Sequence, residues 1–306
     1  MVNVLKHRFE SEELKLLRSL HIRMKLLDQD FKNYMNLEKG FEGEQKYDKW
    51  LAENLSGNFH VLNDLLHEYN KNKFQTDSLI ISEGKFFNIN VKNYEGDYYV
   101  NGDYWHTFSG LEIKNPLLQL QRSETLLRQL LHDLGYNITV ESYCIFINPK
   151  FHLYQAPMNP QFIFPTQLDR FIRKMNNLSS KLNERHSIIA EKLISLHTIE
   201  SPYTRAPSYS YEKLEKSFYC GRCYSLNNYY FKERSVVCHK CGFVEGLESA
   251  VLRCVEEILL LFPNQRITTK VVQEWCKIDS DKTVRRILIK NFNYIGHGRS
   301  SYYVFP

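Results

Sequence analysis

Residues 86–96 read FFNINVKNYEG, and their alternation predicts a strand with two unlike faces. Three apolar residues share one face and three polar residues share the other: Phe87, Ile89 and Val91 against Asn88, Asn90 and Lys92. An apolar face of this kind indicates burial, yet the strand ends on a lysine. The flanking sequence decides whether that lysine is a solvated surface charge or part of a site.

The flanking segments predict an α/β domain around this strand. Alternating apolar runs, turn signals and helical stripes mark the expected elements. We expect strands over 59–67, 74–82, 138–147 and 162–166, a hairpin over 98–106, and helices over 11–37, 41–54, 115–135, 167–176 and 180–198. Ser11 caps the first of these helices, which either packs on its own domain or mediates dimerisation.

Several polar residues around the opening strand form a candidate site. Asn90 and Lys92 share a strand face, and Asp77 lies in the preceding strand, across a short turn. Glu44 lies on the helix before the sheet, and Gln119 opens the helix after the hairpin. Carboxylates can hold Mg²⁺, and the metal and a neighbouring lysine can then stabilise negative charge on a phosphoryl group. Spacing alone leaves open whether these residues form a metal site or are solvated surface charges.

The wider stretch resembles a known family. KGFEGEQKYDKWL, QTDSLIISEGKFFNINVKN and NPLLQ are similar to the nuclease-related domain (NERD) of the PD-(D/E)XK nuclease-like superfamily. The resemblance covers about residues 38–150. The matching positions are Gly40, Gly43, Glu44, Asp77, Gly84, Lys92, Asn93, Asn115, Pro116 and Gln119.

The resemblance implies a restriction-endonuclease-like mixed sheet flanked by helices, and phosphodiester hydrolysis with Mg²⁺ or Mn²⁺. It implies that Glu44 and Asp77 bind the metal, that Lys92 assists the nucleophile and that Gln119 orients the substrate. One position departs from the pattern, because Asn90 stands where the family has an acid. Its carbonyl oxygen can still bind a metal, but it is neutral, and the affinity for hard cations falls with ligand charge. The alternative is therefore a degenerate domain that binds DNA without cutting it.

Four of the seven cysteines form two close pairs with metal-ligand spacing. The ligands we expect are Cys220, Cys223, Cys238 and Cys241, in a C-x2-C, fourteen residues, C-x2-C pattern. Four thiolates complete the tetrahedron of Zn²⁺, so the site is structural, and the segment resembles a zinc ribbon. Nucleic-acid contact and a spacer role remain open for this module.

The C-terminal segment predicts three helices, over 248–263, 267–278 and 279–292, followed by a β-hairpin. This order resembles a winged helix-turn-helix, in which the basic third helix enters the major groove of DNA. The expected nucleic-acid contacts are Lys282, Thr283, Arg286, Lys290 and, on the wing, Arg299. The alternative is a small helical domain that binds protein.

Composition and charge fit this organisation. The 306 residues are 43% hydrophobic and 25% charged with a net charge of +5, which indicates globular domains and permits nucleic acid as a partner. No apolar run is long enough for a membrane span and no secretory signal is apparent, so we expect a cytoplasmic protein without membrane association. The expected parts are an N-terminal helical segment (1–37), the nuclease-like domain (38–200), a linker (201–213), the zinc ribbon (214–246) and the winged-helix-like domain (247–306).

Three functions remain open at this point. The first is a DNA nuclease whose C-terminal modules hold the duplex. The second is a regulatory or architectural DNA-binding protein with an inactive nuclease-like domain, and Asn90 is its main support. The third is a scaffold whose C-terminal modules bind protein.

Overall fold

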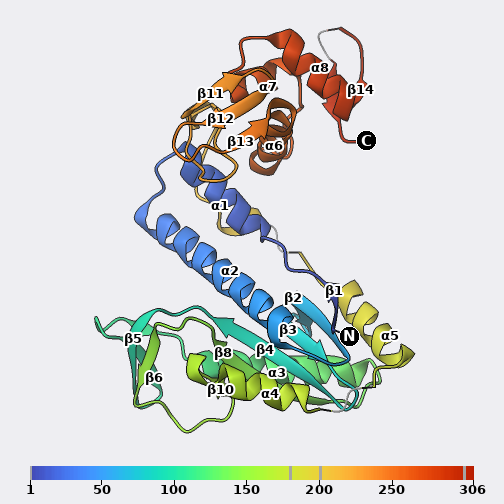
Figure 1. Cartoon of the computed structure of the whole chain (residues 1–306). Helices are drawn as coiled ribbons and strands as arrows, with labels where there is room; N and C mark the ends of the chain where they lie inside the picture. Colours follow the sequence, from blue (N-terminus) through green and yellow to red (C-terminus); the bar gives the residue numbers. More distant parts are fainter. Residues whose placement is uncertain (1, 179–180, 200–201, 299–300) are drawn as a thin grey trace. The chain divides into compact units, whose positions relative to one another are not determined.

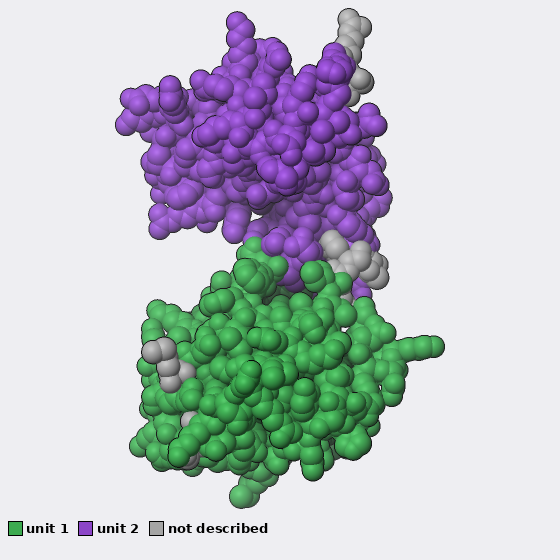
Figure 2. Space-filling view, turned by 90° about the vertical axis from the view of Figure 1, so that its right-hand side faces the viewer, with its two compact units in different colours: residues 1–10, 36–200 green, residues 11–35, 201–306 purple. Residues whose placement is uncertain are grey.

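The computed structural model describes residues 2–178, 181–199, 202–298 and 301–306. The chain forms two compact units (Figure 2). Unit 1 comprises residues 1–10 and 36–200, and unit 2 comprises residues 11–35 and 201–306. The division differs from the expected one, because residues 1–10 belong with the nuclease-like part and residues 11–35 with the C-terminal part. The expected wing residue, Arg299, lies outside the described residues.

Unit 1 is built on a six-stranded mixed sheet (Figure 1). Its order is β1 (Val2–Lys6), β2 (Phe59–Tyr69), β3 (Asn72–Ile81), β4 (Lys85–Lys92), β8 (Thr139–Phe146) and β10 (Phe162–Ile163). Strands β2, β3 and β4 are antiparallel, whereas the pairs β1–β2, β4–β8 and β8–β10 are parallel. The expected α/β class is therefore confirmed. Strand β1 is an edge strand that the sequence reading missed.

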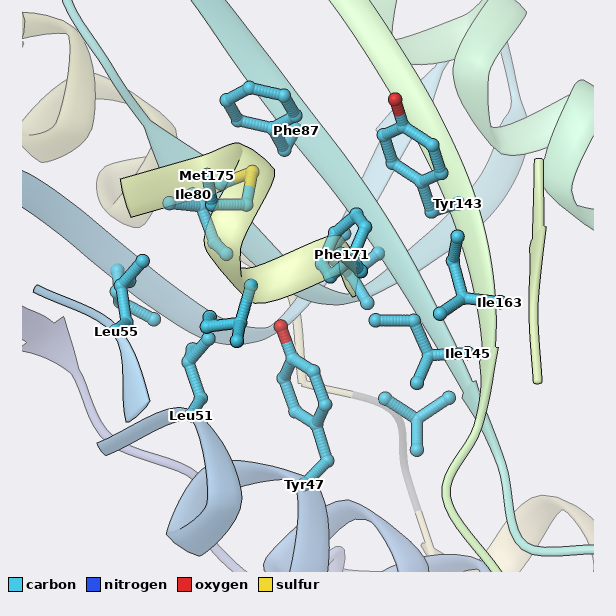
Figure 3. Packing of buried hydrophobic residues seen from close by; sticks show 14 of the residues in the cluster. Tyr47, Leu51, Leu55, Ile80, Phe87, Tyr143, Ile145, Ile163, Phe171 and Met175 are labelled. Carbon is cyan, nitrogen blue, oxygen red and sulfur yellow. The ribbon is translucent and has the colours of Figure 1, made fainter. Parts of the chain in front are cut away.

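Helices cover both faces of this sheet. Helices α2 (Asp28–Asn54) and α4 (Leu168–Asn176) pack on the face that carries Phe87, Ile89 and Val91 (Figure 3). Helices α3 (Pro116–Asp133) and α5 (Glu184–Ser195) pack on the other face. The apolar face of the opening strand is thus buried under helices, as its alternation predicted.

A smaller sheet flanks the end of β4. Its order is β7 (Glu112–Ile113), β6 (Tyr104–Thr107), β5 (Gly96–Asn101) and β9 (Phe151–Tyr154). Aromatic rings fill the space beneath it, with Trp105 stacked on Phe146 at 6.0 Å between ring centroids. The expected hairpin over 98–106 is confirmed as β5 and β6.

The N-terminal helices differ from the expectation. The segment 11–37 does not form one helix: α1 (Glu12–Arg23) ends at the extended residue Met24, and α2 begins at Asp28. Helix α2 then continues through Gly40, where a break was expected. Glycine lowers helix stability by only about 1 kcal/mol, so a long helix with good packing tolerates it. The Ser11 cap is confirmed, since its side chain accepts from the Leu14 amide.

The described residues of unit 2 after residue 201 form a small sheet, three α-helices and a hairpin. The sheet order is β11 (Tyr229–Lys232), β12 (Ser235–Cys238) and β13 (Val244–Gly246). The helices are α6 (Leu247–Leu261), α7 (Thr269–Cys276) and α8 (Asp281–Asn291), followed by the hairpin of β14 (Asn293–Ile295) and β15 (Tyr302–Val304). Ile267, just before α7, bridges to Tyr303 of that hairpin. The expected order of three helices and a hairpin is present.

The segment expected as a linker packs on α6 inside unit 2. It contains two short 3-10 helices, η2 (Pro202–Arg205) and η3 (Tyr211–Lys213). The hydroxyls of Tyr203 and Tyr209 donate to the carbonyls of Leu260 and Leu261. These contacts satisfy carbonyls at the C-terminal end of α6, which have no partner within the helix.

Helix α1 is joined to the rest of unit 2 by a buried ion pair. Arg23 donates to both carboxylate oxygens of Glu257 on α6, at 2.8 and 2.5 Å. It also donates to the carbonyls of Glu215 and Ser217. Trp275 of α7 completes the cluster by donating to Glu257 at 2.9 Å.

Among the described residues, no helix is both long and apolar enough to cross a membrane.

Candidate functional site

The Asp77 carboxylate lies where the ladder between β3 and β4 opens. The last paired residues of these strands are Ser78 and Ile89. Beyond them, Asp77 Oδ2 accepts a hydrogen bond of 2.7 Å from the Val91 amide. The side chain thus takes a backbone donor beside Lys92, and only 5% of Asp77 is exposed. Asp77 therefore faces the expected site.

Asn90, one residue before Val91 on β4, has an unsatisfied side-chain oxygen. The residue is 2% exposed, and its Oδ1 has no hydrogen-bond partner within the described part of the chain. A buried acceptor without a partner costs about 1–3 kcal/mol, so such atoms in native proteins normally contact water or an ion. Asn90 Oδ1 is therefore a candidate ligand atom for a cation.

Lys92 and Gln119 are brought together directly. Lys92 Nζ donates to Gln119 Oε1 at 2.8 Å. The start of α3 explains the position of the glutamine: Asn115 caps the helix by accepting from the Leu117 amide, and Pro116 is its first residue. Gln119 then follows one turn later. The N-P-x-x-Q pattern therefore fixes a helix start that aims the amide at the lysine.

Glu44 is held by Arg8, and Arg8 is held in turn by Asp48; neither residue was singled out by the sequence analysis. Arg8, two residues beyond β1, donates through Nη1 to Glu44 Oε2 at 2.7 Å. Its Nε and Nη2 donate to the two oxygens of Asp48 at 2.9 and 3.2 Å, and Nη2 also donates to the Asp77 carbonyl at 2.7 Å. A sequence signal for this arginine exists: Val2 and Val4 alternate as in a short strand, and the basic residues Lys6 and Arg8 follow them.

Gly43 and Asn93 explain why α2 comes close to the end of β4. A Cβ at position 43 would overlap the Asn93 side chain, so only glycine permits this approach. Asn93 in turn donates to the Lys39 carbonyl at 2.7 Å and accepts from Asn148 at 3.2 Å. These two motif residues therefore have a structural role: they seat the helix that carries Glu44 beside the strand that carries Lys92.

The environment disfavours two ionised carboxylates at this site. Burial raises the pKa of Asp77, although Lys92, the Val91 amide and Arg8 act in the opposite direction. Burial and the nearby Asp77 raise the pKa of Glu44 to about 8, against the lowering effect of Arg8. An acid whose ionisation is opposed by burial and by a neighbouring acid is typical of sites that bind a cation or exchange a proton.

Other acids near the strand are used elsewhere. Glu95, which follows the strand, lies 3.4 Å from Lys150 and 3.9 Å from Lys39.

A cavity of about 790 Å³ lies against β8, β10 and α4, lined in part by Glu141, Tyr143 and Lys174. None of the expected site residues lines it, so this cavity is separate from the candidate metal site.

The four expected zinc ligands converge. The sulfur atoms of Cys220, Cys223, Cys238 and Cys241 all lie within 4.8 Å of one another. Two of the Sγ–Sγ distances are 3.6 Å, close to the roughly 3.8 Å that Zn–S bonds of about 2.3 Å give in a tetrahedron. The donor set therefore fits zinc, and His239 is not part of it.

The two cysteine pairs have matching backbone geometry. In each, the amide of the residue after the second cysteine donates to the carbonyl of the first, from Tyr224 to Cys220 and from Gly242 to Cys238, both at 3.0 Å. Tyr224 and Gly242 both have positive φ, 57° and 68°. The repeated turn directs the two sulfurs of each pair to one point.

On α8, the residues expected to contact nucleic acid differ in whether their side chains are already bonded to other residues. Lys282 and Arg286 are exposed, as is Arg285, which the sequence reading did not single out. Lys290 is paired with Glu248 at 2.9 Å. Thr283 donates from its hydroxyl to Ser280, the N-cap of the helix, at 3.0 Å. Two of the expected contacts therefore have local partners already.

Comparison with known proteins identifies one part of the chain. Residues 39–147 match the family described as the nuclease-related domain, NERD. Neither the comparison with curated proteins nor that with solved structures found a match. The matched segment contains Glu44, Asp77, Asn90, Lys92 and Gln119, while Arg8 lies outside it. Residues 39–147 are therefore a nuclease-related domain, and the function of this part of the chain is nuclease-related.

Proposed function

We propose that this protein cleaves DNA by metal-dependent hydrolysis of a phosphodiester. The observation that carries the proposal is the oxygen of Asn90, which is buried and has no hydrogen-bond partner among the described residues, one residue before the Val91 amide that donates to Asp77. Oxygen atoms of Glu44, Asp77 and Asn90 would hold Mg²⁺ or Mn²⁺, since hard cations take carboxylate and amide oxygens. When bound, the metal supplies Lewis-acid stabilisation of the phosphoryl oxygens and activates water.

The residues of the chain would then act as follows. Lys92 Nζ, already within hydrogen-bond distance of Gln119, lies at the exposed end of the strand, where a phosphate can approach. Its charge stabilises the negative charge that develops on the phosphoryl oxygens. Gln119 fixes the direction of the lysine and offers its amide donors to the substrate.

A second function is favoured by a specific observation. Asn90 is neutral, and Glu44 is already paired with Arg8, so the site offers a metal less negative charge than a set of free acids. Under this alternative the domain binds DNA without cutting it, as a regulatory or architectural factor.

Unit 2 would hold the DNA. Residues 247–306 contain nine Lys/Arg and six Asp/Glu, a net charge of +3. The three helices and hairpin support a winged helix that presents Lys282 and Arg286 to the duplex. The cysteine cluster supports a zinc ribbon with one structural Zn²⁺. Thiolate ligands persist under reducing conditions, which supports a cytoplasmic location.

The deciding experiment is incubation of linear, circular and single-stranded DNA with the protein in Mn²⁺ and in Mg²⁺. We expect cleavage by the wild type and its loss in Asp77→Ala and Lys92→Ala. Lys85→Ala is the matched control, because Lys85 begins the same strand and pairs with Glu141, remote from the site. If wild type and Asp77→Ala are equally inert but bind DNA in a salt-dependent way, the binding function replaces the nuclease.

A further inference from the structure

Arg8 lies outside the segment that matches the nuclease-related family, yet its guanidinium touches the site. The side chain is 3% exposed and pairs with Glu44 and Asp48, whose side chains are 21% and 25% exposed. It also donates to the backbone carbonyl of Asp77. One buried cation from the N-terminal segment therefore joins helix α2 to strand β3 at the point where the acids meet.

The pattern of contacted oxygens separates ligands from supports. Arg8 takes both oxygens of Asp48, so this carboxylate is a counter-ion of the arginine. It takes only Oε2 of Glu44, and at Asp77 only the backbone oxygen. The Val91 amide takes Oδ2 of Asp77. Neither contact uses Glu44 Oε1 or Asp77 Oδ1, and Asn90 Oδ1 has no hydrogen-bond partner in the part of the chain that the structure describes.

We propose that Arg8 is a positioning residue of the metal site, which fixes Glu44 so that Glu44 Oε1, Asp77 Oδ1 and Asn90 Oδ1 face one divalent cation. This inference rests on the proposed function. Residues that hold a ligand by hydrogen bonds typically change metal affinity about 10- to 100-fold when they are removed. The bidentate grip on Asp48 fixes the plane of the guanidinium, and Nη1 then fixes the direction of Glu44.

The opposite role makes the opposite prediction. A buried guanidinium could stand in for the metal by neutralising the acids, and its removal would then increase the affinity for Mn²⁺. Its contact with the Asp77 carbonyl, and not with the Asp77 carboxylate, favours positioning. The sign of the change in affinity separates the two roles.

The test is the dissociation constant for Mn²⁺, measured by titration calorimetry on the full chain. We expect Arg8→Met to bind Mn²⁺ about 10- to 100-fold more weakly than wild type. Arg8→Lys, which keeps the charge but lacks the planar fork, should fall between the two. Lys6→Met is the matched control: Lys6 is a cation of β1 whose hydrogen bonds, among the described residues, go to the carbonyls of Asn63 and Asp64, so its loss should leave the affinity near wild type.

Folding of the variants is controlled separately. Arg8→Met leaves Asp48 without its counter-ion, so we pair it with the variant Arg8→Met/Asp48→Asn, compared against Asp48→Asn alone. Circular dichroism identifies which variants remain folded, and the double variant should still show the loss of Mn²⁺ affinity.

The outcomes distinguish this inference from the proposed function. If wild type binds Mn²⁺, Asp77→Ala does not, and a folded Arg8→Met binds like wild type or more tightly, the positioning role is overturned and the metal site stands. If wild type and Asp77→Ala both fail to bind Mn²⁺, both proposals are overturned.

Discussion

Two buried arginines from the first 23 residues of the chain have contrasting surroundings. Arg23 in unit 2 and its partner Glu257 are 0% and 2% exposed in their side chains, and Trp275 supplies a further donor to the same carboxylate. The Arg8 side chain in unit 1 is 3% exposed, but its partner Glu44 is 21% exposed and has one oxygen that the arginine does not use. The first cluster is closed, and the second is open on one side.

This difference separates a structural ion pair from a candidate site. A buried pair with all its groups satisfied fixes the packing of the elements that carry it. A partly buried acid with an oxygen that its arginine does not use, and with a pKa that burial raises, retains capacity for a ligand. Burial of an arginine therefore does not by itself distinguish a structural ion pair from a ligand site. The distinction depends on whether the second oxygen of the partner carboxylate is already bonded.

The largest effect should come from zinc. Arg23 donates hydrogen bonds to the carbonyls of Glu215 and Ser217, shortly before Cys220. The small sheet β11–β13 could therefore be ordered either by these contacts or by the metal. Structural zinc contributes about 10–16 kcal/mol in zinc-finger peptides, so we expect chelation to remove amide protection across β11–β13. Hydrogen exchange measures this, with α3 of unit 1 as the internal control. Unchanged protection would show that the arginine cluster suffices.

The next effect concerns the closed pair. Glu257→Gln keeps an acceptor for Trp275 but leaves the Arg23 charge buried and unpaired. We expect a loss of about 3–5 kcal/mol in the free energy of unfolding of unit 2. Urea unfolding followed through the Trp275 indole resonance measures it. Arg23→Met/Glu257→Gln should recover part of the loss, and a double variant as unstable as the single one would contradict this account.

The open cluster should respond to pH. The pKa of Glu44 is raised from 4.5 to about 8, so the folded protein binds its proton more tightly than the unfolded chain does. The stabilising contribution is therefore complete below about pH 4.5 and is lost as the pH rises towards 8. Unfolding of unit 1 measured from pH 5 to 8 should show stability falling with pH, more steeply in wild type than in Glu44→Gln. Equal slopes in the two proteins would contradict the raised pKa.

The smallest effect should come from an exposed pair. Lys290 and Glu248 are 67% and 40% exposed in their side chains, and such pairs contribute about 0–1 kcal/mol. Lys290→Ala should therefore change the unfolding of unit 2 within this range. If α8 contacts DNA, Arg286→Ala should weaken binding more than Lys290→Ala, because Lys290 is already held by Glu248. Gel shifts at several salt concentrations measure this, and the reverse order would show that the pair opens on binding.

The sequence determined much of the local structure and the motif residues of the site. The alternation of FFNINVKN gave the faces of β4, and the N-P-x-x-Q pattern placed Gln119 at a helix start that meets Lys92. The cysteine spacing gave the four sulfurs that converge. These features follow from periodicity, capping and ligand spacing, which act over a few residues or within one motif.

Only the tertiary structure decided how the two arginines are used. Arg8 meets Glu44 across 36 positions and Arg23 meets Glu257 across 234, and no local pattern connects either pair. The continuous course of α2 through Gly40 was likewise decided by packing, because burial of Tyr47, Leu51 and Leu55 against the sheet outweighs the low helix propensity of glycine. Periodicity and motif spacing name the elements and the ligands, but long-range packing decides which charge is buried beside which oxygen.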